Sequence, residues 1–531
     1  MRIRTIHDYR TSHERKLLNP YAFPDSHCCG NDQTGSRNGC NGDRFTSRGH
    51  LETILRPPAC EFDYRALPAR HSTRPVPIAY IRIRWGTSTC MQRIPRRAAI
   101  TGLTYLLSRA YAKGQQIVRA TDNEKAPGNA SSGPSPVPAE DDALLDEIER
   151  ATFLYFREQA HPQSGLVKDR CNVRTDADRG TAASIATTGF GLTALCIGTE
   201  RGYVSRSDAR DQVITTLRFL YTRMPTHRGF FFHWADVRTG ERIWDSEVSS
   251  IDTAILLCGV LACRRYFRNA EISRLATLIF NRVNWTWLSA DTSLLPHGWT
   301  PESGFLQYRW DYYSELMMMY LLGLGAPVYP LPVETWHAWK RSTFEYEGLR
   351  YIGSFAPLFV HQYSQAWFDF RGKRDRYANY FQNSVIATEV HRRFCLELAS
   401  RFPHFSDDLW GITSSDSKNG YAVWGGPPEM GPVDGSVVPS AAAGSLPFLP
   451  RETLRVLRTI RTRYGSHTWS RYGFVNAFNP MTQWYDTDVV GIDTGITLLM
   501  AENLRTGFVW KIFNANPEVQ RAFRRAGFAN E

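Results

Sequence analysis

A long succession of helical segments, with few stretches that could form strands, most constrains the fold of this chain. From Asp141 to the end, apolar residues recur at intervals of three and four, which is typical of helices that bury one face. The expected helices span 187–202, 207–224, 249–269, 271–289, 305–324, 332–345, 376–401, 451–463, 486–504 and 516–526. Three short stretches suggest strands, at 230–234, 351–355 and 421–424, and no strand–helix alternation indicates a parallel sheet.

No change of composition divides residues 141–531, so we expect one domain there. About a dozen helices in one uninterrupted block predict an all-α (α/α)6 toroid, in which inner and outer helices alternate around an axis. Short β-hairpin elements would lie in the loops. A functional site would then form where the loops at one end of the helices meet.

Residues 1–140 differ from this block. Residues 1–90 show no helical or strand period, and we expect either a disordered extension or sequence translated from upstream of the true start. Residues 113–140 are rich in Pro, Ser, Gly and Ala, which predicts a disordered linker.

Between these two segments, residues 91–112 have the layout of a signal peptide that starts at Met91. The arginine pair Arg96-Arg97 precedes an apolar run at 98–107, and Ala110-Tyr111-Ala112 fits a cleavage site. Paired arginines are typical of the twin-arginine export route. We therefore expect a periplasmic or secreted protein, without a stable membrane span because the apolar run is too short.

The net charge of +11 does not indicate a nucleic-acid partner, because it is confined to the N-terminal part. Residues 1–112 carry 18 Lys and Arg but 8 Asp and Glu, a net charge of +10, and the remainder carries +1. A near-neutral body lacks the basic surface that binds phosphate backbones.

Five of the ten cysteines lie in the main body, and none stands at zinc-ligand spacing with histidines. Their apolar, helical surroundings predict buried free thiols, with one disulfide as the alternative.

The stretch 305–322, FLQYRWDYYSELMMMYLL, combines a helical apolar rhythm with two acids, Asp311 and Glu315. Four positions apart on a helix, both carboxylates would project from one face. Aromatic neighbours can exclude water from such a carboxyl and raise its pKa, which makes a proton donor. The alternative is an amphipathic helix whose acids point into water.

A second group of acids, Asp245, Glu247 and Asp252, lies in WDSEVSSID just before an apolar helical run. Ser249 or Ser250 could cap that helix and place Asp252 in its first turn, where an acid also serves helix stability alone. Glu247 has less structural reason to be there.

A glycosidase needs two carboxyl groups on either side of the scissile bond, one protonated and one ionised. This chain places acids beside Trp and Tyr at several loop and helix edges, without a metal-ligand cluster, a Gly-x-Ser-x-Gly elbow or a nucleotide loop. The pattern favours a glycosidase that uses no metal or other cofactor.

Six motifs, in order along the chain, resemble the glycoamylase-like domain family, which includes glycoside hydrolase family 144. They are SEVSSIDTAILL (246–257), YRWDYYSELMMMYLLGLG (308–325), HQYSQAWFDFRG (361–372), WGITSSDSKNGYAVWGGPPE (410–429), RYGFVNAFNP (471–480) and GIDTGITLLMAENLRTGFVWKIF (491–513). The resemblance covers about residues 141–530.

The resemblance implies an (α/α)6 barrel that hydrolyses β-1,2-glucan with inversion, as an endo-β-1,2-glucanase or an exo enzyme that releases sophorose. It implies that Glu315, in the YSEL match, is the general acid. Acids of the SEVSSID match are also implicated, first Glu247 and then Asp245 and Asp252. The base that activates water is either Glu247 or Asp493, which stands in GIDTG at an expected helix start.

For the substrate, an oligo- or polysaccharide, we expect stacking aromatic rings and hydroxyl-binding polar groups, although each such residue can instead serve ordinary packing. The expected stacking residues are Trp244, Tyr312, Trp424 and Trp484, and the hydroxyl-binding residues are Arg170, Asp311, His361 and Glu429. The alternatives to hydrolysis are a glycan-transferring domain, as in cyclic β-1,2-glucan synthases, and a carbohydrate-binding protein. We expect a monomer.

Overall fold

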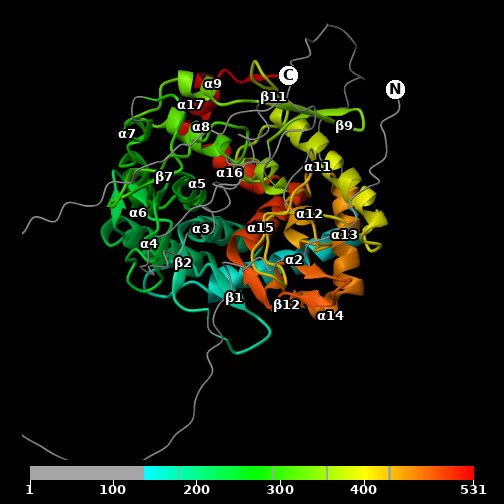
Figure 1. The fold of residues 1–531 in the computed structure, drawn as a ribbon. Helices are drawn as coiled ribbons and strands as arrows, with labels where there is room; N and C mark the ends of the chain where they lie inside the picture. The colour runs from blue at the N-terminus through cyan, green and yellow to red at the C-terminus, as the bar shows by residue number, and fades with distance from the viewer. Residues whose placement is uncertain (1–136, 178, 290–291, 355–356, 428–431) are drawn as a thin grey trace, which may run out of the picture. The chain divides into compact units, whose positions relative to one another are not determined.

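Helices dominate the computed structural model, as the sequence predicts (Figure 1). It describes residues 137–531 except 178, 290–291, 355–356 and 428–431, and these residues belong to one compact unit. The helices are α2 Ala139–Glu158, α3 Ile185–Glu200, α4 Arg206–Thr222, α5 Ser250–Phe267, α6 Ala270–Asn281, α7 Trp285–Ser289, α8 Met317–Gly325, α9 Glu334–Ala338, η1 Leu358–His361, α10 Tyr363–Trp367, α11 Tyr380–Glu397, η2 Leu398–Ser400, α12 Pro439–Ala443, α13 Pro450–Arg463, α14 Gly465–Thr468, α15 Gly491–Arg505, α16 Phe508–Asn514 and α17 Pro517–Arg525.

The strands are short and pair locally or with one distant partner. They are β1 Arg170–Asn172, β2 Ala182–Ser184, β3 Thr226–His227, β4 Phe230–Phe231, β5 Trp234–Asp236, β6 Val248–Ser249, β7 Gly298–Thr300, β8 Gly304–Phe305, β9 Thr343–Tyr346, β10 Leu349–Ile352, β11 Lys373–Arg374, β12 Trp469–Ser470, β13 Gly473–Phe474, β14 Phe478–Asn479, β15 Trp484–Tyr485, β16 Asp488–Val490 and β17 Ala529–Asn530. All the described ladders are antiparallel, and β6, β7 and β8 form a three-stranded sheet.

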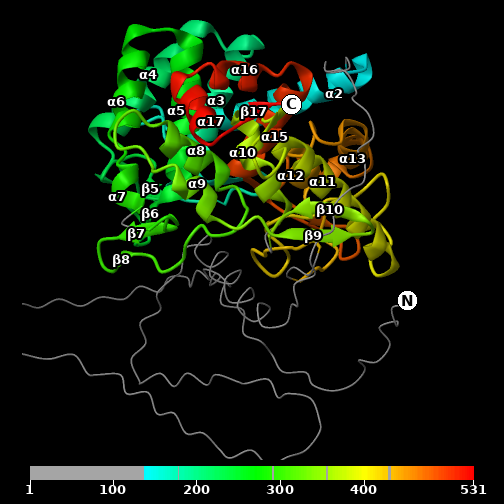
Figure 2. The ribbon, with the colours of Figure 1, turned by 90° about the horizontal axis from the view of Figure 1, so that it is seen from above.

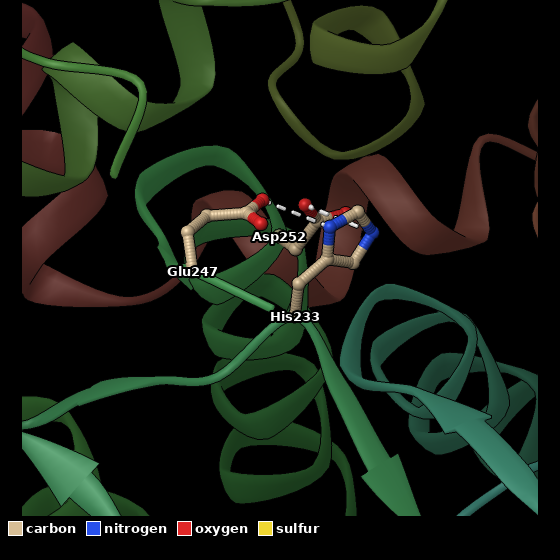
Figure 3. A group of neighbouring side chains, drawn as sticks. All are labelled: His233, Glu247 and Asp252. Carbon is tan, nitrogen blue, oxygen red and sulfur yellow. Dashed lines mark hydrogen bonds and ion pairs between the residues drawn. The ribbon is translucent and has the colours of Figure 1, made fainter. Parts of the chain in front are cut away.

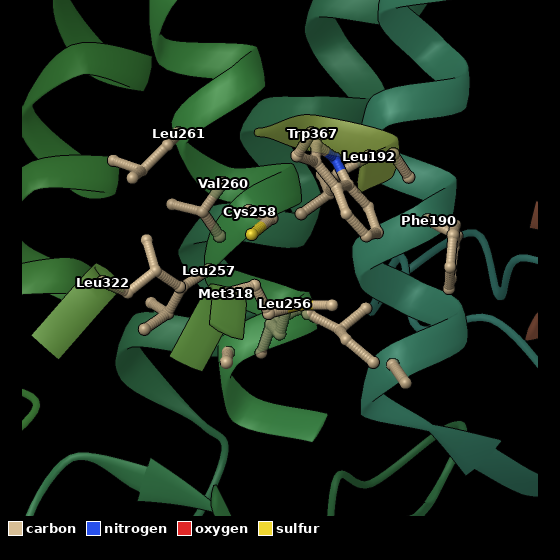
Figure 4. Close-up of a cluster of buried hydrophobic side chains, with 14 of the residues drawn as sticks. Phe190, Leu192, Leu256, Leu257, Cys258, Val260, Leu261, Met318, Leu322 and Trp367 are labelled. Atoms are coloured by element: carbon tan, nitrogen blue, oxygen red, sulfur yellow. The ribbon is translucent and has the colours of Figure 1, made fainter. Parts of the chain in front are cut away.

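The centre of the fold is built from helices that are apolar on every side, and such helices must be buried. Helix α3 is buried over almost its whole length and lies between α5 and α15. Polar-faced helices cover this centre: α2 packs on α15 and α3, whereas α4 and α6 pack on α5. Figure 4 shows the apolar side chains that α3, α5 and α8 contribute, including Phe190, Leu257 and Met318.

Gly189 and Gly259 allow the backbones of α3 and α5 to lie close together. A Cβ atom on Gly259 would lie closer than 3.0 Å to the carbonyl oxygen of Gly189, and one on Gly189 would lie 2.5 Å from the carbonyl oxygen of Ile255. Because these neighbours are backbone atoms, a side chain could be accommodated only by separating the two helices.

Gly259→Ala is therefore expected to lower the free energy of unfolding by about 3 kcal/mol, as overpacking of a rigid core does, although alanine favours helix formation. Denaturant unfolding measures the change. Gly465→Ala on α14 is the matched control, because its Cβ would meet only the tip of the Arg461 side chain at 3.0 Å. Equal stability of the two variants would contradict the tight crossing.

Several central helices begin directly after a short strand. Strand β2 leads into α3, β6 into α5 and β16 into α15, and their partners are β5, β7 and β1 respectively. Each pairing fixes where the following helix starts. Strands β5 to β10 lie at one end of the helices (Figure 2).

The expected helix at 305–324 is wrong for its first twelve residues. Helix α8 begins only at Met317, and the preceding backbone forms bridges to Pro296 and Lys340. The carbonyl of Asp311 accepts the N–H of Lys340 (2.7 Å) instead of a helical N–H. Asp311 and Glu315 therefore do not share a helix face.

Other expected elements differ less. Of the helix expected at 332–345, only α9 forms, and residues 343–346 are strand β9, paired with β10. A single bridge, between Ser415 and Ala422, replaces the strand expected at 421–424. The expected helices at 187–202, 207–224 and 451–463 are confirmed within two residues at each end as α3, α4 and α13.

The cysteine prediction is confirmed for the described residues Cys196, Cys258, Cys263 and Cys395, which are buried free thiols, whereas Cys171 is only partly buried. Among the described helices, none is long and apolar enough to cross a membrane. The expected extension, signal peptide and most of the linker lie outside the described residues and stay predictions.

Candidate active site

One pocket opens where several central helices begin. It is lined at the start of α3 by Ser184, at the start of α5 by Ser249, Ile251 and Asp252, before α8 by Glu315, at α10 by Tyr363, and at the start of α15 by Ile492 and Asp493. About 1080 Å³ of its space is free of protein atoms, part of it open to solvent. The positive ends of helices favour negative charge, which explains why carboxylates are tolerated here.

Aromatic rings form much of the remaining wall. They are Trp234, His297, Tyr308, Trp310, Phe359, Tyr363 and Tyr421. Burial lowers the pKa of His297 to about 3, so this ring is neutral and acts as part of the apolar wall. Its centroid lies 4.2 Å from that of Trp310.

Glu247, His233 and Asp252 form one connected group in the pocket (Figure 3). His233 Nδ1 lies 2.9 Å from Glu247 Oε1, and His233 Nε2 lies 3.5 Å from Asp252 Oδ2. Ser249 caps α5 by accepting the N–H of Asp252 (3.1 Å), and its hydroxyl donates to Asp252 Oδ2 (2.6 Å). The expected cap of α5 and the first-turn position of Asp252 are thus confirmed.

These three residues are also the group among the described side chains that comes nearest to a metal site, with ligand atoms within 4.8 Å of one another. The two carboxylates, however, face different nitrogens of the same ring. The ring therefore pairs with both acids at once.

Asp493 lies in the first turn of α15, with its carboxyl enclosed by neighbours although part of the residue reaches the pocket surface. Ser440 donates to Oδ1 (3.1 Å) and Asn476 donates to Oδ2 (2.6 Å). Burial raises the pKa of Asp493 to about 7, more than the hydrogen bond from Ser440 lowers it. The group can therefore change its protonation state near neutral pH.

Arg170 is held at the pocket wall by three carboxylates. Its guanidinium contacts Asp416 (2.6 Å), Asp488 (3.1 Å) and Asp169 (3.3 Å). Asp486 adds a fourth acid nearby, and burial together with the charges of Asp416 and Asp488 raises its pKa. The surplus of negative charge fixes the position of Arg170.

Glu315 lies two residues before α8, with its side chain in the pocket and 6% of the residue exposed. Ser364 donates to its backbone carbonyl (2.8 Å), which ties this turn to α10. This hydrogen bond fixes the backbone of Glu315 between the starts of α8 and α10.

Comparison with known proteins places this fold in a family. The Glycoamylase family model, described as "Putative glucoamylase", matches residues 307–517. A "putative glucoamylase" from Bacteroides caccae has a crystal structure that is 30% identical in sequence, with a TM-score of 0.70, and the match covers 74% of this chain and 100% of that one. The chain belongs to the glycoamylase-like family.

Two further relatives of this glycoamylase-like protein have named activities. The exo β-1,2-glucooligosaccharide sophorohydrolase (non-reducing end) of Parabacteroides distasonis is 27% identical over 471 residues, and the match covers 81% of this chain and 64% of that protein. The endo-β-1,2-glucanase of Chitinophaga pinensis, solved with sophorotriose and glucose, is 26% identical with a TM-score of 0.70, over 73% of this chain and 99% of that one.

Five of the residues singled out from the sequence meet in the pocket of the glycoamylase-like protein. They are Arg170, Glu247, Asp252, Glu315 and Asp493. They come from segments up to 323 residues apart, between Arg170 and Asp493, so the fold alone brings them together.

Other predicted binding residues do not line the pocket. Asp311 and Tyr312 face Lys340, which donates to the Tyr312 hydroxyl (3.1 Å), because this segment is extended rather than helical. His361 is buried against the hydroxyl of Tyr313 (3.1 Å), and burial lowers its pKa to about 3.

Trp424 and Trp484 pack on the second hydrophobic cluster of the fold, and the Trp424 indole donates to Ser415 Oγ (3.0 Å). Trp244 and Asp245 are exposed on a loop outside the pocket. Glu429 lies outside the described residues.

Several wall residues are not among those predicted from the sequence, although the sequence carries a signal for two of them. Tyr308 and Trp310 line the pocket whereas Arg309 and Asp311 do not. This is the two-residue alternation of an extended strand. A period of two over residues 308–311 predicts that the rings of Tyr308 and Trp310 lie on the same face.

Proposed function

We propose that this glycoamylase-like protein is a glycoside hydrolase that cleaves β-1,2-glucan with inversion at the anomeric carbon. The observation that carries the proposal is the gathering of Glu315, Glu247 and Asp493 in one pocket with aromatic walls. The two relatives with named activities, an exo-acting sophorohydrolase and an endo-β-1,2-glucanase, support the choice of linkage.

In this mechanism, Glu315 donates its proton to the glycosidic oxygen of the leaving sugar. Asp493 accepts a proton from water, which attacks C1 from the opposite face as the C1–O bond breaks. A base works best when its pKa lies near the working pH, and the pKa of Asp493, about 7, meets this condition. An inverting pair requires roughly 6.5–9.5 Å between the two carboxyl groups, which leaves room for the water.

The remaining polar groups would bind and orient the sugar. Glu247 and Asp252 accept hydrogen bonds from glucose hydroxyls, and Arg170 donates to them.

We further propose that the fold is a closed (α/α)6 toroid whose inner helices are α3, α5, α8, α10, α12 and α15. Helix α3 contacts α5 and α15, α8 contacts α5 and α10, and both α10 and α12 contact α15. Helices α2, α4, α6, α11, α13 and α17 would be the outer set.

The proposal is tested with β-1,2-, β-1,3- and α-1,4-glucans offered in parallel. Release of reducing ends from β-1,2-glucan alone is expected, and NMR at early times should show the α-anomer of the new reducing end. Products longer than the substrate would indicate a glycan-transferring domain instead. Binding without cleavage would indicate a carbohydrate-binding protein.

Trp244 offers an outer platform for a longer glucan. Its residue is 53% exposed, and its ring lies 5.4 Å from that of Trp234 in the pocket wall. Trp244 and Asp245 both adopt left-handed backbone angles, φ 57° and 48°. Such strain costs roughly 1–3 kcal/mol for each residue and accumulates at functional sites.

Trp244→Ala is therefore expected to lower kcat/KM about 10-fold for long β-1,2-glucans, because loss of a stacked sugar costs roughly 1 kcal/mol or more. Cleavage of the shortest substrate should change little, because it would not reach this ring. Initial rates over a series of chain lengths measure the difference. Exposed Met481, at 54%, is the control position: Met481→Ala should leave the series unchanged.

A further inference from the structure

His233 lies between two carboxylates of the pocket and contacts a different one with each ring nitrogen (Figure 3). We propose that His233 is a positioning residue: its ring carries both protons, pairs with both acids and holds the Glu247 side chain aimed into the pocket. This inference rests on the proposed function, because it assigns His233 a part in the same reaction.

The two acids that face the His233 ring favour its doubly protonated form. A neutral imidazole has one N–H donor, whereas an imidazolium has two. Glu247 Oε1 lies 2.9 Å from Nδ1, within hydrogen-bond distance, and Asp252 Oδ2 lies 3.5 Å from Nε2, within ion-pair distance. Two acids that face opposite sides of one ring favour its positively charged form, because an opposite charge within about 4–6 Å favours the charged form of a group.

The backbone around His233 leaves its ring little freedom. The N–H of His233 donates to the carbonyl of Glu247 (2.9 Å), and its own carbonyl accepts the N–H of Ile185 (3.3 Å). The ring stacks on Trp234 with 4.5 Å between centroids and 18° between planes. His233 and Glu247 are therefore fixed to each other through both main chain and side chain.

Asp252 holds the other side of the His233 ring in place. Ser249 anchors its carboxylate and its N–H at the start of α5. Asp252, which is fixed at the start of α5, positions the His233 ring. The ring in turn positions Glu247, which stands one residue before β6. Removing the ring would leave Glu247 a choice of side-chain rotamers, and its orientation toward the sugar would be lost.

Two near-isosteric substitutions separate the roles of the two nitrogens. The amide nitrogen of Asn lies where Nδ1 of histidine lies, and that of Gln lies where Nε2 lies. His233→Asn keeps a donor toward Glu247, and His233→Gln keeps one toward Asp252. We expect kcat on β-1,2-glucan to fall less than about 10-fold in His233→Asn and roughly 10²-fold in His233→Gln and His233→Ala, with KM changed less than kcat.

A double-mutant cycle tests whether His233 acts through Glu247. In the Glu247→Gln background, His233→Ala should cause little further loss, because the interaction is already absent. His337→Asn is the control, because this histidine lies on α9 against Tyr377, and its kcat should match the wild type. Equal losses in His233→Asn and His233→Gln, or additive losses in the cycle, would overturn the proposal.

A measurement without substrate separates this inference from the proposed function. Nitrogen NMR of histidine-labelled protein at pH 7 should show an imidazolium signal in the wild type that vanishes in His233→Asn. A neutral ring would overturn the positioning role whatever the activity. An imidazolium ring in a protein that cleaves none of the three glucans would instead reject the proposed function alone.

Discussion

Glu315→Gln is expected to lower kcat on β-1,2-glucan roughly 10³-fold, because the leaving sugar would depart without a proton donor. The fold should stay intact, since glutamine has the same shape and the backbone contact with Ser364 does not involve the side chain. Reducing-end release measures the rate, and thermal unfolding verifies the fold. Glu271→Gln, on the surface of α6, is the control and should leave the rate unchanged.

The leaving group distinguishes a general acid from a residue that only binds. In a nitrophenyl glycoside of sophorose the leaving group is nitrophenolate, which departs without protonation, so Glu315→Gln should lose far less activity on this substrate than on glucan. Equal losses on both substrates would show that Glu315 is not the proton donor.

Asp493→Ala is expected to lower kcat by a similar factor, roughly 10³, because no group would accept the proton of the attacking water. Azide needs no base, so it should restore turnover by attacking C1 as Glu315 protonates the departing oxygen. The product would be an α-glycosyl azide, identified by NMR. Azide rescue of Glu247→Ala but not of Asp493→Ala would assign the base to Glu247.

The pH profile of the wild type gives a second check on Asp493. A base must be ionised to act, and burial raises the pKa of this carboxyl to about 7. The value of kcat/KM should therefore fall as the pH drops below about 7. A profile that stays level down to pH 5 would exclude Asp493 as the base.

The sequence predicted the long helices well, because several of them carry their own start signals. Helix α3 has a serine cap, and α13 starts with proline, so both could be located within two residues. The failure at 305–316 has a tertiary cause. Tyr308 to Tyr313 bond to distant backbone at Leu295, His297 and Lys340, and aromatic residues favour such extended pairing.

The catalytic candidates could be identified from motifs, but their environment could not. The prediction of Glu315 as a catalytic residue rests on the YSEL motif. It does not depend on the helix expected at 305–324, which is wrong at that position. His233 was missed because a histidine beside a tryptophan in a strand-like segment has no local sign of function. Its role depends on Glu247 and Asp252, which lie 14 and 19 positions further along the chain.

The acids of the pocket lie at or near the starts of different helices, so they come together only when the protein folds. Glu247, Glu315 and Asp493 occupy one hollow only after α5, α8 and α15 have docked. A chain halted during synthesis before α15, or one caught in a partly assembled state, lacks the complete group of acids. During refolding from denaturant, activity should therefore return with the slowest kinetic phase, later than helical circular dichroism.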